Sequence, residues 1–255
     1  MNEIEITNTT LFFLLVFIII PVCLSYYYSL GLSRSILWSA FRGISQLLLI
    51  GYILTFLFGL EPLQGIPLML AIMIMTAALH AAKKGKGIPY ILPVVFIIMV
   101  VIEGMVLALW LSFQIIDFEP DQVIPMSGMV IGNSMVAIGL ALDKLKSEMK
   151  TEKEKILASL ALGASPAQAT QPFVKRIIRS AMIPNIDGLK TIGIVQLPGM
   201  MTGLILGGVS PLVAVRFQIV ISLSIFVAVS LSAMLAVLIV YRFFFNSRMQ
   251  LIERE

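Results

Sequence analysis

The sequence predicts an all-α polytopic membrane protein, and two observations support this fold class. Hydrophobic residues make up 59% of the 255 residues, charged residues only 13%, and the mean hydropathy is +1.00. Soluble domains contain about 45–50% apolar residues. Apolar stretches of about 20 residues also recur along the chain. Each is long enough to cross a hydrocarbon core of about 30 Å as a helix, which satisfies its own backbone hydrogen bonds.

Seven stretches meet this length requirement, and we call them spans one to seven. In chain order they cover residues 9–30, 35–58, 63–82, 88–116, 122–142, 191–209 and 211–241. Together they predict a single transmembrane domain over the whole chain. The longest segment outside them, residues 143–190, is large enough to present a surface to a partner in water.

The charges of the connecting segments alternate in sign along the chain. One set is acidic and consists of Glu3, Glu5, Glu61, Asp117, Glu119 and Asp121. The other set is basic and consists of Arg34, Lys83, Lys84, Lys86, the Lys and Arg of residues 143–190, Arg242, Arg248 and Arg254. Lys and Arg near span ends stay on the cytoplasmic side. We therefore expect a multi-pass protein of the cell inner membrane, with its N-terminus outside and its C-terminus in the cytoplasm.

The same bias explains the net charge of +4, so the charge gives no reason to expect a nucleic-acid partner. The chain lacks H-E-x-x-H and G-x-S-x-G and has one histidine, which argues against common hydrolase chemistry. It also lacks G-x-x-x-x-G-K-[ST], so an ATP site has to belong to another chain. We predict a protein that is not an enzyme and holds no cofactor of its own.

Residues 162–169, "LGASPAQA", predict a sharp corner between two helices of the segment 143–190. Gly163 suits the left-handed conformation that closes a helix. Ser165 suits an N-cap, Pro166 the first helical position, and Gln168 completes a capping box. The following helix is basic and amphipathic, which suits the inner membrane surface. Local physics alone explains these residues equally well as ordinary turn chemistry.

The run 156–184, which contains "LALGASPAQATQPFVKRIIRSAMIP", resembles the cytoplasmic-loop pattern of ABC transporter permeases. In that family an Ala-rich helix, a Gly and a later Leu/Ile-Pro form a coupling helix, which sits in a cleft of the ATPase subunit. Ser159, Leu160 and Ala161 stand where importers often carry Glu-Ala-Ala. The resemblance implies that the ATPase-coupling residues are Leu162, Gly163, Ala164, Ser165, Pro166 and Gln168.

Three further segments resemble the FetB-type permease family, which is associated with iron export in bacteria and aluminium tolerance in plants. They are "ILWSAFRGISQLLLIGYIL" (36–54), "QVIPMSGMVIGNSMVAIGL" (122–140) and "LPGMMTGLILGGVSPLVAVRFQIV" (197–220). The resemblance implies a permease subunit that exports iron or another metal ion. It also implies a homodimer with two cytoplasmic ATPase subunits that bind ATP and Mg. An organic solute such as a nucleotide sugar, or a scaffold without a transport cycle, remain alternatives.

Polar and irregular positions inside the spans are the candidates for a substrate path. Glu103 lies near the middle of span four, where an ionisable residue is costly and is a functional candidate by default. The alternative is a protonated or partnered carboxyl that fixes helix packing. Asn133 lies deep in span five. The segment "LPGMMTG" is our preferred path segment, with Pro198, Gly199, Met200, Met201 and Thr202.

Glycines at every fourth residue predict close helix packing. Gly128 and Gly132 in span five, and Gly203 and Gly207 in span six, allow backbones to approach within a protomer or across a dimer. Pro198 before this second pair, together with Gly208 and Pro211 after it, marks span six as the span most apt to be broken.

A possible metal contact lies in span three. Met69, Met73, Thr76 and His80 share one helical stripe, and His80 is the candidate ligand at its inner end. Such a stripe serves packing more often than metal binding.

Overall fold

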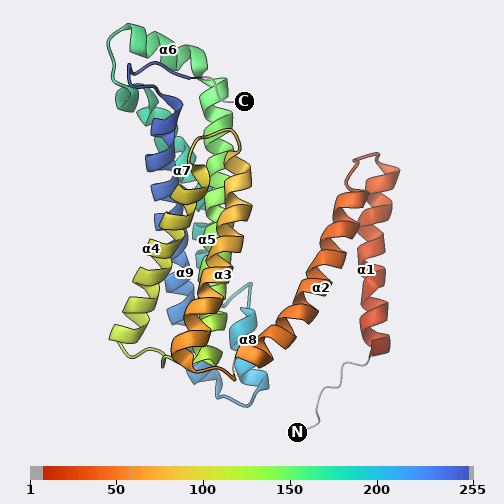
Figure 1. The fold of residues 1–255 in the computed structure, drawn as a ribbon. Coiled ribbons are helices and arrows are strands. Elements are labelled where there is room, and N and C mark those ends of the chain that lie inside the picture. The colour runs from red at the N-terminus through yellow and green to blue at the C-terminus, as the bar shows by residue number, and fades with distance from the viewer. Residues whose placement is uncertain (1–7, 58, 253–255) are drawn as a thin grey trace. The chain divides into compact units, whose positions relative to one another are not determined.

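The structure is a computed structural model that describes residues 8–57 and 59–252, and these residues are overwhelmingly helical. The chain forms two compact units, Met1–Leu60 and Glu61–Glu255. Figure 1 shows both units as ribbons. Glu3, Glu5 and Arg254, which the topology prediction uses, lie outside the described residues.

The first unit is a helical hairpin of α1 (Asn8–Tyr27) and α2 (Ser33–Leu57). Ser29 and Gly31 adopt positive φ angles of 52° and 69° in the turn between the helices. The buried hydroxyl oxygen of Ser25 accepts hydrogen bonds from the Leu32 amide and the Ser33 hydroxyl, both at 3.1 Å. These bonds satisfy polar groups of the turn and fix the reversal of the chain.

The second unit is a bundle built around α5 (Pro120–Thr151), which packs against α3 (Pro62–Ala82), α4 (Ile91–Ser112) and α9 (Pro211–Val240). Side chains such as Ile138 and Leu142 are fully buried in this core. At 1.5 Å per residue, the 32 residues of α5 extend about 48 Å. Helix α5 therefore continues beyond the predicted span end at residue 142.

Five described helices are long and apolar enough to cross a membrane, namely α2, α3, α4, α5 and α9. The polytopic all-α fold class is thus confirmed. Helix α1 covers most of predicted span one. Span six is the exception among the seven predicted spans.

Span six, predicted over residues 191–209, is broken, as its Pro198, Gly208 and Pro211 indicate. Helix α8 covers only Gly199–Leu206, and eight residues extend about 12 Å. Residues 192–198 form an irregular segment in which Gly193 has φ 80° and its amide donates to the Gln196 carbonyl at 2.9 Å. Pro198 has no amide hydrogen to continue a helix, and Gly208, at φ 93°, follows the end of α8.

The expected position of the basic helix after the corner also needs correction. This helix, α7 (Pro166–Thr191), follows α6 (Lys153–Ala161) and packs against α5 and α9. Val174, Ile177 and Ala181 on its apolar face are buried by protein, so this face is not available to lie on the membrane surface.

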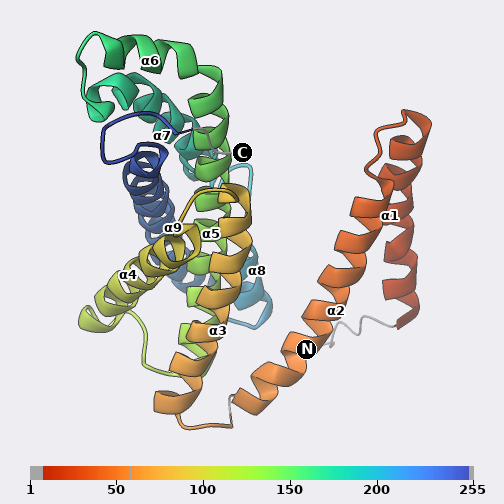
Figure 2. The same cartoon turned by 45° about the horizontal axis from the view of Figure 1, so that its top comes forward.

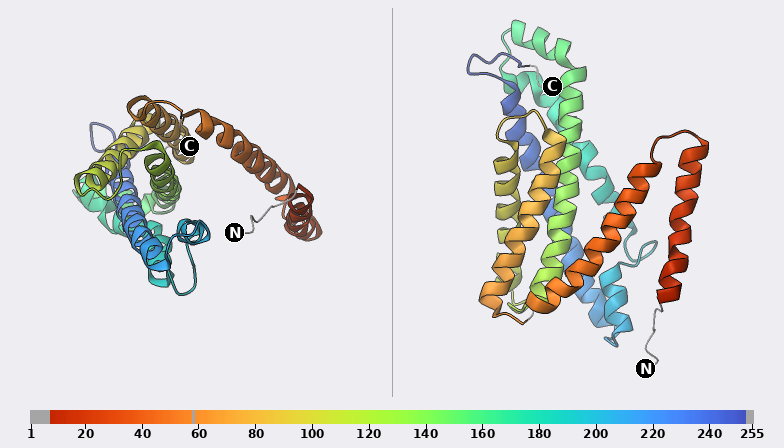
Figure 3. Two further views of the ribbon diagram at one scale, coloured as in Figure 1. Left: turned by 90° about the horizontal axis from the view of Figure 1, so that it is seen from below. Right: turned by 45° about the vertical axis from the view of Figure 1, so that its right-hand side comes forward.

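The second half of α7 runs beside the membrane-spanning part of α9. The Asn185 side-chain amide donates to the carbonyl of Phe226, which is midway along α9, at 3.3 Å. Figure 3 shows α7, the irregular segment and α8 following one another along the bundle. The final part of residues 143–190 therefore belongs to the bundle, and predicted span six is not a single helix.

The glycine spacing serves helix packing at one described position within the protomer. A Cβ at Gly128 would lie 2.9 Å from Cε of Met73 in α3, whereas no atom lies within 4 Å of a Cβ at Gly132 or Gly203. A Cβ at Gly207 would approach the backbone of its own turn. Close packing of spans five and six within the protomer is not observed, because α8 packs against α9. The dimer alternative stays a prediction.

The two ends of the second unit carry charges of opposite sign. The turn after α3, which contains the 3-10 helix η1 (Lys83–Gly85), lies at the same end as α6 and the C-terminal segment, as Figures 1 and 2 show. The loop with Asp117, Glu119 and Asp121 lies at the end where α8 meets α9. This separation of charge agrees with the alternation seen in the sequence.

Trp110 joins α4 to α9 in the core and provides a stability test. Its side chain is 1% exposed, and its indole nitrogen donates to the Ser224 hydroxyl at 2.8 Å. We expect Trp110→Ala to destabilise the protein by about 3 kcal/mol or more, because a large cavity replaces the indole. Thermal unfolding in detergent measures this loss. The matched substitution Phe113→Ala, at a side chain that is 71% exposed, is expected to lower the melting temperature far less.

Candidate functional site

A polar cavity of about 510 Å³ lies where the sixth crossing is broken. Its walls come from α5, the second half of α7, the irregular segment 192–198, α8 and α9. The polar side chains that line it are Asn133, Asn185, Gln196, Gln218 and Ser222. No charged side chain is among the described residues of this lining. The cavity therefore offers neutral oxygen and nitrogen atoms in an otherwise apolar bundle.

Two of these residues stand one turn apart on α9 and orient each other. The Gln218 side-chain nitrogen donates to the Ser222 hydroxyl at 2.8 Å. The Gln218 carbonyl oxygen is buried and has no hydrogen-bond partner in the described part of the chain. An unpaired buried acceptor is costly. It is well suited to receive a cation or a hydrogen-bond donor from a solute, since amide oxygens are ligands of hard cations.

A second pocket, of about 720 Å³, lies at the acidic end of the bundle. Asp117 and Asp121 line it, together with the amides of Gln114 and Gln122. Met129 of α5 and Met200 of α8 line both this pocket and the polar cavity. The two thioether side chains thus form a shared wall between them, and methionine is flexible enough to change the width of such a wall.

Four of the predicted path residues lie in the wall of the polar cavity, namely Asn133, Pro198, Gly199 and Met200. Met201 and Thr202 are not among its lining residues, and the Thr202 hydroxyl donates to the Pro198 carbonyl at 3.2 Å. Sequence reasoning missed Asn185, Gln196, Gln218 and Ser222. The i, i+4 spacing of Gln218 and Ser222 in the strongly apolar span seven is the sequence signal that could have identified these two residues.

Glu103 lies elsewhere, in the core of α4 and α5. Its side chain is 3% exposed, and both carboxyl oxygens lack a hydrogen-bond partner among the described residues. The buried Ser127 hydroxyl interacts with the carboxyl without forming a hydrogen bond of good geometry. Burying a charged carboxylate without a hydrogen-bond partner costs free energy of folding, so the stability of the protein is sensitive to the chemistry of residue Glu103. A role for Glu103 in the substrate path stays a prediction, because it does not line the cavity.

His80 lies exposed in the last turn of α3. In the described residues, no group of three or more His, Cys, Asp or Glu is arranged to hold a metal ion. Met69 of the same stripe is buried in the protein core, in accord with a packing role. The metal contact at His80 stays a prediction.

The predicted corner between α6 and α7 is confirmed as a structural feature, which we call the elbow (residues 162–168). Gly163 has φ 89°. The Ser165 hydroxyl accepts from the Gln168 amide at 3.4 Å, and the Gln168 side chain accepts from the Ser165 amide at 2.9 Å. Pro166 begins α7. Leu162 is 89% exposed at the tip, so a large apolar side chain protrudes from a rigid turn.

Arg176 ties the elbow to α5. Its guanidinium donates to the carboxylates of both Glu148 and Glu152, the latter at 2.9 Å. The Glu152 carboxylate also forms an ion pair with the Lys155 ammonium group, with an Nζ–Oε2 distance of 2.6 Å. The Lys155 hydrogen bond, and then that of Arg176, lowers the pKa of the Glu152 carboxyl below its ordinary value. Helix α7 is therefore ion-paired to the end of α5 that extends beyond the predicted span.

These features define a polytopic helical membrane protein with a polar cavity at a broken crossing and a protruding elbow at its basic end. A comparison with family models places the chain by sequence: residues 8–245 match "Uncharacterised protein family (UPF0014)". The chain belongs to this family.

Named relatives cover nearly the whole chain. It is 38% identical to "Probable iron export permease protein FetB" of Escherichia coli (strain K12), over 99% of this chain and 97% of that protein. It is 34% identical to "UPF0014 membrane protein STAR2" of Oryza sativa subsp. japonica, over 90% and 81%. It is 32% identical to "Protein ALUMINUM SENSITIVE 3" of Arabidopsis thaliana, over 93% and 87%. No solved structure matches the chain.

The ion pairs of Arg176 lead to a pH prediction. A carboxyl whose pKa is lowered by folding contributes stability above its unfolded pKa and loses it as the pH falls through the lower folded value. We expect amide hydrogen exchange in residues 144–180, corrected for its intrinsic pH dependence, to be slow at pH 7 and to rise below about pH 4. Arg176→Gln is expected to raise exchange several-fold at pH 7. Arg179→Gln, at an exposed position one turn further on, serves as the control. Equal exchange in both variants would contradict the role of Arg176.

Proposed function

We propose that this chain is the membrane-spanning subunit of an ABC transporter that exports iron or another metal cation. The observation that carries the proposal is the polar cavity at the broken crossing, which adjoins an acidic pocket at one end of the bundle. The name of the Escherichia coli relative, an iron export permease, supports the substrate class. ATP and Mg belong to a separate cytoplasmic ATPase subunit.

The two pockets define the proposed path. A cation enters the polar cavity and is held by amide and hydroxyl oxygens, among them the unpaired oxygen of Gln218. Neutral ligands hold a cation weakly enough for it to leave, which transport requires. It then passes Met129 and Met200 toward Asp117 and Asp121, whose negative charge attracts it outward. The acidic end of the bundle is outside, and the basic end faces the cytoplasm.

The elbow is the proposed contact with the ATPase. Leu162 protrudes there, and the capping box and Arg176 hold the turn rigidly to α5 and α7. Helix α7 then leads without interruption to the irregular segment 192–198 in the cavity wall. A displacement of the elbow is thereby carried along one helix to the part of the cavity that lacks regular backbone hydrogen bonds.

Charged residues on α7 support a homodimer. Asp187 and Lys190 form an ion pair at 3.2 Å on the exposed side of α7. They follow Asn185, which bonds to the middle of α9, by two and five residues. Charges at this depth face protein or water in preference to lipid. We infer that a second copy of the chain covers this side and encloses the path.

Substitution of Leu162 tests the coupling. We expect Leu162→Asp to abolish co-purification of the ATPase subunit and metal export, because a charge replaces the exposed apolar tip. Leu157→Asp on α6, where the side chain is 42% exposed, provides the matched control. If the Leu162 variant still retains the ATPase subunit and cellular iron stays normal, the elbow is not the contact with the ATPase.

Substitution of Gln218 tests the cavity. We expect Gln218→Leu to lower metal-stimulated ATPase activity and metal export about tenfold, because a hydrogen bond to a charged group contributes about 1.5 kcal/mol or more. Gln64→Leu, at an exposed position near the start of α3, is the control. If a nucleotide sugar, and not metal ions, stimulates the ATPase activity of the reconstituted complex, then the substrate is an organic solute and not a metal cation.

A further inference from the structure

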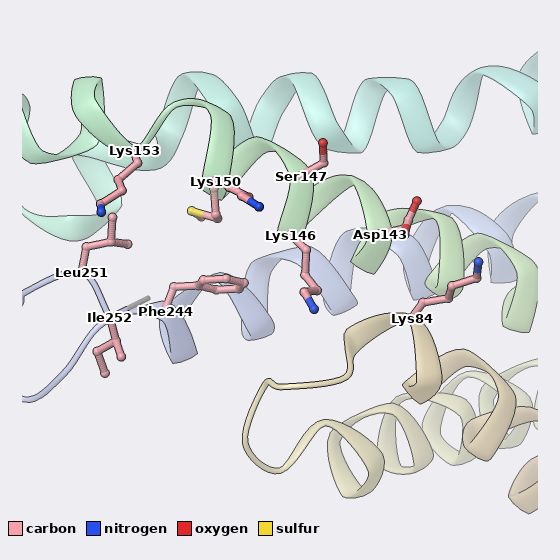
Figure 4. A pocket seen from close by; sticks show the side chains of 10 residues that line it. Lys84, Asp143, Lys146, Ser147, Lys150, Lys153, Phe244, Leu251 and Ile252 are labelled. Atoms are coloured by element: carbon pink, nitrogen blue, oxygen red, sulfur yellow. The ribbon is translucent and has the colours of Figure 1, made fainter. Parts of the chain in front are cut away.

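A cleft lined by lysines opens at the basic end of the second unit, away from the polar cavity. Its volume is about 820 Å³. Figure 4 shows that its side chains come from separate elements: Lys84 from η1, Lys146 and Lys150 from α5, and Phe244, Leu251 and Ile252 from the C-terminal segment. We call this the basic cleft. Neither the elbow nor the proposed path uses it.

The apolar side of the basic cleft is built by a turn that folds the C-terminal segment back. The Asn246 side-chain oxygen accepts from the amides of Arg248 and Gln250, each at 2.9 Å. The Ile252 amide then donates to the Phe244 carbonyl at 2.7 Å. These bonds place Leu251 and Ile252 beside Phe244, opposite the lysines of α5. The wall is thus an ordered structure and not a loose chain end.

Three lysines of the cleft lack an ion pair within the described part of the chain. Lys84, Lys146 and Lys150 make no ion pair with a described acidic side chain, and Lys146 donates instead to the Lys86 carbonyl at 2.7 Å. Asp143 is the acidic residue on the described lining, which also includes Lys153. Like charges gathered around one cavity repel one another, and a bound anion relieves that repulsion.

The position of the cleft identifies the chemistry of the anion. Lys84 lies in the last turn of the candidate span Pro62–Gly85, and Phe244 ends the candidate span that begins with α9. The cleft therefore opens where the spans leave the hydrocarbon, at the level of lipid phosphates. Basic pockets between helices on the cytoplasmic side bind phosphate headgroups. An apolar wall beside the lysines adds a surface that an acyl chain can contact.

We propose that the basic cleft binds a phosphate group, and that the headgroup of an anionic phospholipid of the cytoplasmic leaflet supplies it. The bound phosphate lies among the lysines of the cleft, and the adjoining acyl chain lies against Phe244 and Ile252. This ligand joins the turn after α3, the extension of α5 and the C-terminal segment. The site goes beyond the proposed function and does not depend on which solute is exported.

The test uses the full chain in a neutral detergent, titrated with short-chain phosphatidylglycerol, short-chain phosphatidylcholine or inorganic phosphate. Native mass spectrometry measures binding, and thermal unfolding measures stabilisation. We expect phosphatidylglycerol to bind and to raise the melting temperature, with little effect of the other two. Each lysine near the membrane surface contributes about 1 kcal/mol, which is about fivefold in affinity. Lys84→Gln/Lys150→Gln is expected to weaken binding by about 20-fold or more.

Two further variants keep the result interpretable. Lys175→Gln/Arg179→Gln on α7 removes the same two positive charges from positions that do not line the cleft, and phosphatidylglycerol binding is expected to persist. Lys150→Gln alone, at an exposed site, is expected to fold normally and to lose about fivefold. Equal weakening by the α7 pair would overturn the proposal in favour of general surface charge. Equal binding of inorganic phosphate would retain the phosphate site but overturn its lipid source.

Discussion

The arrangement of the second unit depends on one constraint, which is that backbone groups without helical hydrogen bonds have to be covered by protein or water at membrane depth. Residues 192–198 interrupt the sixth crossing, and the amides of Asn133, Asn185 and Gln218 gather around the interruption. The cavity and the broken backbone are therefore one feature. A continuous helix at this position would satisfy its own backbone and leave no reason for a polar lining.

Helix α5 connects the cavity to the elbow and to the basic cleft. It supplies Asn133 and Met129 to the cavity and Lys146 and Lys150 to the basic cleft. Its last turns carry the carboxylates that bind Arg176 of α7. Because α5 is one uninterrupted helix with a buried core face, a change at any of these places is felt along the same rigid element. Helix α7 is its complement, since it joins the rigid elbow to the irregular segment.

The unsatisfied polar atoms fall into two groups with different meanings. The Gln218 oxygen adjoins a cavity, where a solute or water can reach it. The Glu103 oxygens lie in the packed core between α4 and α5 and have no such access through the cavity lining. The first position suits transient binding during transport. The second is a buried carboxyl, and the packing of the surrounding helices compensates the free energy that its burial costs.

Features that depend on neighbouring residues or on composition could be predicted from the amino-acid sequence. The apolar stretches located α2, α3, α4 and α9, the charges of the loops separated the two ends, and Gly163 with the Ser165 capping box fixed the elbow. These features follow from local chemistry, because a short segment of sequence determines both its turn conformation and its preference for the bilayer over water. The packing of α7 into the bundle, and the set of polar residues that share a cavity, became known from the three-dimensional arrangement alone. Asn133, Asn185 and Gln218 lie far apart in sequence, and their meeting follows from helix packing, which no local pattern specifies.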